Sequence, residues 1–160
     1  MAKLIITIVV MIILTCSIQA ANNFEQNPII EHLKLSMSDL DEFQYSLKRC
    51  AGLLLASVTA MHKLSKEQGA QEVVDMGEDL MEFMAKFQIT KIFGKELTQE
   101  IFSKVYRDNI EEVQKFNRLY YLRFQNNFKE QKLLIEQDSF LKEEVISCMG
   151  VHDQLLRVNQ

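Results

Sequence analysis

Two cysteines and one histidine are the residues whose types and spacing could do chemistry together: Cys50, Cys148 and His152. On a helix, side chains four positions apart share one face, so Cys148 and His152 could both reach a metal ion. A structural zinc site takes four protein ligands, and the sequence offers only Cys50 as a third. Cys148 and His152 are therefore candidate metal ligands in an incomplete set, and a histidine at the edge of a helical core is the commoner reading.

A disulfide between Cys50 and Cys148 competes with any metal site, because it would use both sulfur atoms. Both cysteines fall on apolar stripes with helical spacing. A bridge that closes about a hundred residues stabilises a fold by several kcal/mol in the chain-entropy model. The alternative is a pair of buried free thiols, which pack as small hydrophobic groups. An exported chain meets an oxidising compartment, so we expect the bridge.

Motifs for catalysis or for a cofactor are absent from the sequence. It contains no phosphate loop, no nucleotide fingerprint, no His-Glu-x-x-His helix and no Gly-x-Ser-x-Gly elbow. Cys-x-x-Cys and the haem-attachment spacing Cys-x-x-Cys-His are missing as well. We therefore expect a protein that is not an enzyme and that carries no cofactor.

The first twenty residues read as a secretory leader, with Lys3 before the apolar run Leu4 to Leu14 and small residues up to Ala20. The run is shorter than the ~20 apolar residues that span a bilayer, so no stable transmembrane anchor is expected. Cys16 provides an alternative, in which it is acylated and becomes the first residue of a lipoprotein.

This interpretation divides the chain into a signal peptide, 1–20, and a single helical domain, 21–160. It predicts export to a bacterial periplasm or secretion. The chain carries 22 acidic and 18 basic residues, a net charge of −4. Nucleic-acid binding needs a concentrated positive face, so it is not expected here.

The composition favours helices, because one proline and five glycines are too few for the frequent turns of an all-β fold. Asn27 and Pro28 predict the start of a short lead-in helix through Leu33. Ser38 is the expected N-cap of the next helix, which runs from Leu40 to Leu64. This helix is apolar nearly all round between Ala51 and Met61, as expected of a helix covered by its neighbours.

Three more helices are expected, and each starts or stops at a recognisable residue. One spans about 71–93 and ends at Gly94. The next begins at Thr98 and either continues through Ile135 or breaks at Asn126–Asn127. The last starts at Asp138 or Ser139, with apolar residues and His152 three or four positions apart.

The pattern predicts an all-α, up-down-up-down four-helix bundle with a short N-terminal lead-in helix and one disulfide. We expect a non-enzymatic binding or structural module, whose partner would be another envelope or extracellular protein or a small hydrophobic ligand. The alternative is a carrier of a small ligand or metal that uses the Cys148 and His152 end of the bundle.

Overall fold

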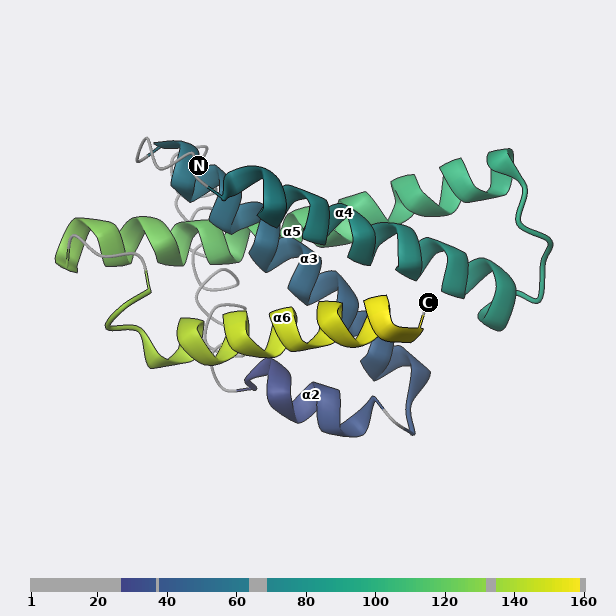
Figure 1. The fold of residues 1–160 in the computed structure, drawn as a ribbon, viewed down its shortest axis with the longest axis horizontal. Coiled ribbons are helices and arrows are strands. Elements are labelled where there is room, and N and C mark those ends of the chain that lie inside the picture. The colour runs from purple at the N-terminus through teal and green to yellow at the C-terminus, as the bar shows by residue number, and fades with distance from the viewer. Residues whose placement is uncertain (1–26, 37, 64–68, 132–134, 159–160) are drawn as a thin grey trace, which may run out of the picture.

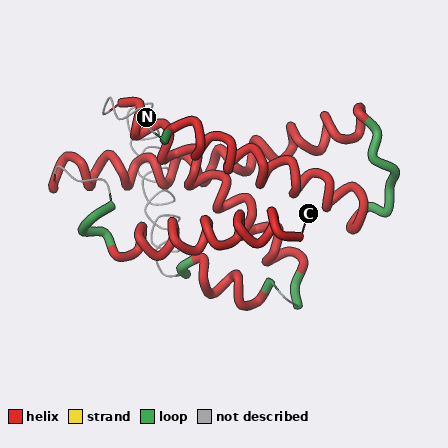
Figure 2. Tube along the Cα trace, in the orientation of Figure 1, coloured by secondary structure: helices red, strands yellow, loops and turns green. Residues whose placement is uncertain are grey.

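A computed structural model describes residues 27–36, 38–63, 69–131 and 135–158, so the expected leader lies outside the described residues. Figures 1 and 2 show that the described chain is built of helices: α2 (Ile29–Leu35), α3 (Leu40–Lys63), α4 (Ala70–Phe87), the π-helix η1 (Gln88–Ile92), α5 (Gln99–Gln131) and α6 (Ser139–Val158). No strand occurs in these ranges, which confirms the all-helical class. Within them, no helix combines the length and apolarity needed to cross a membrane.

Asp39, and not the predicted Ser38, caps the N-terminus of α3. The Asp39 carboxylate accepts the backbone N–H groups of Asp41 at 2.8 Å and Glu42 at 3.3 Å. The hydroxyl of Ser38 instead donates to the carbonyl of Leu35 at 3.2 Å. The prediction was wrong because Ser38 is used to close the turn after α2.

The helix α5 runs unbroken through Asn126 and Asn127, so the predicted break there is wrong, but α5 ends at Gln131 and Ile135 lies outside it. The amide of Asn127 donates to Asp138 at 2.7 Å, so it does not compete for the backbone of its own helix. The last helix, α6, begins at Ser139, one of the two predicted starts, and Asp138 caps it by accepting the N–H of Leu141 at 3.0 Å. Burial alone would raise the pKa of Asp138, but hydrogen bonds from Arg123, Asn127 and Leu141 hold it below its ordinary value.

The helix α4 ends differently from the prediction of one regular helix over 71–93. Its α-helical part stops at Phe87, and a π-helical turn, Gln88–Ile92, follows. Gly94 has a φ of +60°, the left-handed conformation predicted for the residue that ends this helix. Thr98 caps α5 by accepting the N–H of Ile101 at 3.3 Å, also as predicted.

The central position predicted for α3 is confirmed, since α3 packs against α2, α4, α5 and α6. In Figure 1 it crosses the molecule diagonally, with α4 and α5 in the upper half and α6 and α2 below. Gly52 sets the distance between α3 and α5: an added Cβ would lie 2.5 Å from the Cβ of Phe116 and 2.9 Å from the backbone nitrogen of Asn117. The two helices therefore need a residue without a side chain at this position.

The sulfur atoms of Cys50 and Cys148 lie 2.13 Å apart, the distance of a disulfide, and their Cα atoms are 5.2 Å apart. The predicted pairing of these two cysteines across α3 and α6 therefore fits the structure. Both residues are fully buried.

An ion pair that the sequence did not reveal lies beside the two cysteines. Arg49 of α3 and Glu144 of α6 are fully buried, and their charged groups meet at 2.9 Å. The Nε of Arg49 also donates to the hydroxyl of Tyr120 in α5 at 2.9 Å. Glu144 accepts the backbone N–H of Ile29 at 2.6 Å, and Arg49 donates to the carbonyl of Asn27 at 2.7 Å. This network joins α3, α5, α6 and the start of α2 at one point.

The local electrostatics keep the Arg49 guanidinium charged and the Tyr120 phenol neutral. Burial raises the pKa of Tyr120 well above its ordinary value, more than the nearby Arg49 lowers it. Burial acts to lower the pKa of Arg49, but Tyr120 and Glu144 outweigh it and the pKa is raised. The network therefore holds one positive charge, one negative charge and a neutral hydroxyl that donates to Glu144.

Replacing Gly52 and Gly150 by alanine should change stability in opposite directions. Gly52→Ala gains up to about 1 kcal/mol of helix propensity but collides with the α5 backbone, so a net loss of about 1–3 kcal/mol is expected. Gly150 lies exposed on α6 with no neighbour near an added Cβ, so Gly150→Ala should gain about 0.5–1 kcal/mol. Urea unfolding followed by circular dichroism measures both. Equal effects would contradict the close approach of α3 and α5.

Glu144→Gln should destabilise the fold by about 3–5 kcal/mol, because it leaves the Arg49 charge buried without a counter-charge. Its neighbour Glu143 is exposed on the same helix and provides a matched control. Glu143→Gln should stay within about 0.5 kcal/mol of the parent chain. The same unfolding measurement applies. A loss below about 1 kcal/mol in Glu144→Gln would show that the pair is not needed for stability.

Candidate functional site

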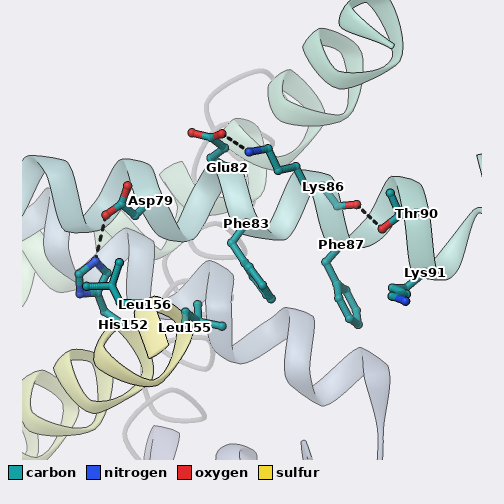
Figure 3. A pocket seen from close by; sticks show the side chains of 10 residues that line it. All are labelled: Asp79, Glu82, Phe83, Lys86, Phe87, Thr90, Lys91, His152, Leu155 and Leu156. Carbon is teal, nitrogen blue, oxygen red and sulfur yellow. Dashed lines mark hydrogen bonds and ion pairs between the residues drawn. The ribbon is translucent and has the colours of Figure 1, made fainter. Parts of the chain in front are cut away.

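A cleft of about 520 Å³ lies between α4 and α6, in the size range of small-molecule sites. Its walls come from the outer face of α4 with the turn after it, and from the last two turns of α6, as Figure 3 shows. The lining combines aromatic, aliphatic and charged side chains: Asp79, Glu82, Phe83, Lys86, Phe87, Thr90, Lys91, His152, Leu155 and Leu156.

The apolar part of the cleft is an aromatic wall on α4. Phe83 and Phe87 lie one turn apart, and their rings stack with centroids 6.0 Å apart. Phe43 of α3 meets both rings edge-on, at 6.3 Å from Phe83 and 5.3 Å from Phe87. In Figure 3 both phenylalanine side chains point from α4 into the cleft, with Leu155 at the facing end of α6. The contact with α3 therefore fixes the orientation of a wall that can receive an apolar group.

His152 and Asp79 close one end of the cleft. The Nε2 of His152 lies 3.1 Å from a carboxylate oxygen of Asp79, and its Nδ1 lies 3.9 Å from Asp153. The His152 side chain is 9% exposed, whereas Asp79 is 55% exposed. The imidazole is thus held between two carboxylates and joins α6 to α4 across the cleft.

Positive side chains lie at the other end. Lys86 pairs with Glu82 one turn earlier, so that charge is compensated. Lys91 lines the cleft beyond Phe87 and is exposed, and no described side chain forms an ion pair with it. Thr90, the hydroxyl residue in the lining, donates to the carbonyl of Lys86 at 2.9 Å. The ammonium group of Lys91 is therefore the charge at this end that forms no ion pair with a described side chain.

The arrangement suits binding better than catalysis. The hydroxyl of Thr90 and the imidazole of His152 stand at opposite ends of the view in Figure 3, so they do not form a nucleophile and base pair. An apolar wall between a carboxylate–imidazole pair and an ammonium group instead matches a molecule with an apolar body and a polar end.

The structure separates the two residues that the sequence grouped as weak metal candidates. Cys148 lies at bonding distance from Cys50, and His152 turns toward Asp79. Among the described residues, no three His, Cys, Asp or Glu side chains are placed to share a metal ion.

Sequence reasoning identified part of the cleft. It selected His152 of the last helix as a candidate, and it did not single out the aromatic wall. It missed Asp79. No sequence signal connects Asp79 with His152, because 73 positions separate them.

No family model matches this chain, and no curated protein or solved structure matches it either.

Proposed function

We propose that this protein is an exported, non-enzymatic binding module that holds a small amphipathic acid in the cleft between α4 and α6. The observation that carries the proposal is the aromatic wall of Phe83 and Phe87, fixed by Phe43 and followed by the open ammonium group of Lys91. An apolar chain or ring would pack on the wall, and its carboxylate would lie toward Lys91.

The end of the cleft at Asp79 and His152 favours the same orientation of the ligand. Asp79 would repel an acid, so the anionic group of the ligand is expected near Lys91 and its apolar body toward Leu155 and His152. A ligand of this kind needs no metal, and Cys148 takes no part in holding it. The module is thus the small-ligand form of the carrier that the sequence suggested.

Two independent features support the proposal that the protein is exported. The first twenty residues have the order of a secretory leader, a positive residue before an apolar run and small residues. The two remaining cysteines stand at disulfide distance, which is compatible with an oxidising compartment. We also propose that α3 to α6 follow an up-down-up-down path, supported by their alternating directions in Figure 1.

Titration calorimetry with decanoate tests the binding cleft, with decanol as the neutral comparison. Phe87→Ala should weaken decanoate binding about tenfold or more through lost apolar burial. Lys91→Gln should weaken it about two- to fivefold and leave decanol unaffected, because only the acid meets the charge. Lys142→Gln, on the exposed side of α6, provides a control of equal charge change that should leave binding unchanged.

Circular dichroism of each variant shows that the fold is retained. The proposal fails if the folded parent protein does not bind decanoate saturably, or if Phe87→Ala and Lys91→Gln bind it as the parent does.

Intact mass spectrometry of the protein recovered from the exported fraction tests the leader and the bridge together. We expect the mass of residues 21–160 less two hydrogens, and recovery of those hydrogens after reduction. A lipid adduct on a chain that starts at Cys16 would support the lipoprotein alternative. A mass that includes the leader, or a fully reduced chain, would contradict the proposed processing or the proposed bridge.

A further inference from the structure

A second cavity, of about 630 Å³, lies where the π-helical end of α4 meets α5. Lys48 of α3 lines it from one side and Lys95, in the connection to α5, from another. None of its lining residues belongs to the cleft between α4 and α6. The cavity is therefore a separate candidate site.

The floor of this cavity carries two buried amides, Gln88 and Asn109, which are 8% and 3% exposed. The Nδ2 of Asn109 donates to the Oε1 of Gln88 at 2.7 Å, and Gln88 donates onward to the Oε1 of Gln44. Gln44 in turn donates to the carbonyl of Leu40 at 3.4 Å. The amides thus form a chain with a single direction, and each donor polarises the next.

The chain of hydrogen-bonded amides ends at the Oδ1 of Asn109. No hydrogen bond to a described residue uses the Oδ1 of Asn109, although the residue is more than nine-tenths buried. The atom is not among the fully buried side-chain atoms that lack a hydrogen-bond partner, so it keeps contact with solvent and can accept from a water or a ligand. Asn109 lines the cavity, so its carbonyl oxygen is available to a donor group there.

The π-helical turn helps to build this cavity. The N–H of Phe93 donates to the carbonyl of Gln88 at 2.9 Å, and the N–H of Lys95 donates to Ile89 at 2.9 Å. These hydrogen bonds span five and six residues, whereas an α-helical hydrogen bond spans four, and single π-helical turns are often found at functional sites. They bring Phe93 and Lys95 to the cavity, with the Lys95 ammonium 5.9 Å from the centre of the Phe93 ring.

Positive charge in the lining exceeds the negative charge available to neutralise it. Lys48, Lys95 and Arg107 line the cavity, and no described side chain forms an ion pair with any of them. Arg107 and Lys95 are exposed, whereas Lys48 is half-buried. The whole chain has a net charge of −4, so a positive surplus at this point is local.

The acids in the lining are mostly paired elsewhere. Asp108 binds Lys104 at 2.6 Å, and Glu112 binds Lys115 at 2.5 Å. The hydrogen bond and charge of Lys115, with the charge of Lys48 added, hold the pKa of Glu112 below its ordinary value. The lining as a whole has four cations, Lys48, Lys95, Lys104 and Arg107, against three carboxylates, a surplus of one positive charge.

We propose that this cavity binds a small organic anion, an aromatic body that carries a phosphate or carboxylate group. The anionic group lies between Lys95 and Arg107, and the ring packs on the apolar side chains of Ile101 and Val105. A hydroxyl or amine on the body donates to the open oxygen of Asn109. The inference does not depend on the proposed function, because the two sites share no lining residue.

Titration calorimetry with phenyl phosphate, on the processed full-length protein, tests this site. The parent protein should bind phenyl phosphate saturably, inorganic phosphate more weakly because it lacks the ring, and benzyl alcohol not measurably. The same titration with benzoate shows whether the site prefers a carboxylate to a phosphate. The double variant Lys95→Gln, Arg107→Gln should weaken phenyl phosphate binding about tenfold or more.

Two variants act as controls, and circular dichroism shows that all are folded. Lys142→Gln on α6 should bind phenyl phosphate as the parent does, and Lys91→Gln reports whether the anion binds in the cleft between α4 and α6. The proposal is overturned by the absence of saturable binding, by benzyl alcohol binding as tightly as phenyl phosphate, or by an equal loss in Lys142→Gln. An equal loss in Lys91→Gln would place the anion in the cleft between α4 and α6 instead.

Discussion

The buried ion pair of Arg49 and Glu144 is the interaction on which the arrangement of the helices depends. Two charges taken out of water cost several kcal/mol each, and their attraction offsets that cost only when every remaining polar group is satisfied. Here the hydroxyl of Tyr120 and the backbone at Asn27 and Ile29 complete the set. A shift of α6 along α3 would leave both charges buried and unpaired, so one position of α6 is strongly preferred.

The cysteines reinforce the same position. Cys50 follows Arg49 in α3, and Cys148 lies one turn after Glu144 in α6. The polar and the covalent contact therefore act at one crossing of the two helices. With α6 held there, His152 comes one turn later at the edge of α4, where it meets Asp79. The cleft beyond it exists because only the C-terminal turns of α6 face α4.

The helix α4 and the π-helical turn η1 that follows it line two separate cavities. Phe83 and Phe87 face α6 and form an apolar wall, whereas Gln88 begins the π-helical turn and faces α5. One extra residue in a turn changes which side chains face which neighbour. The same helix can thus present an aromatic surface on one side and an amide floor on the other.

The sequence by itself determined the features that depend on local spacing. The helical period predicted α3 as the central helix and placed Cys50 and Cys148 on buried stripes. It also located Thr98 as a cap and the start of α6 at Asp138 or Ser139, because neighbours within one or two turns decide these matters. Tertiary structure alone decided the rest. Local spacing does not indicate that Arg49 and Glu144 are buried, because they pair across 95 positions. Asn127 could break a helix by its type, but in the fold its amide donates to Asp138. Burial of a polar group depends on its partner, and the spacing along a chain does not reveal partners that folding brings together.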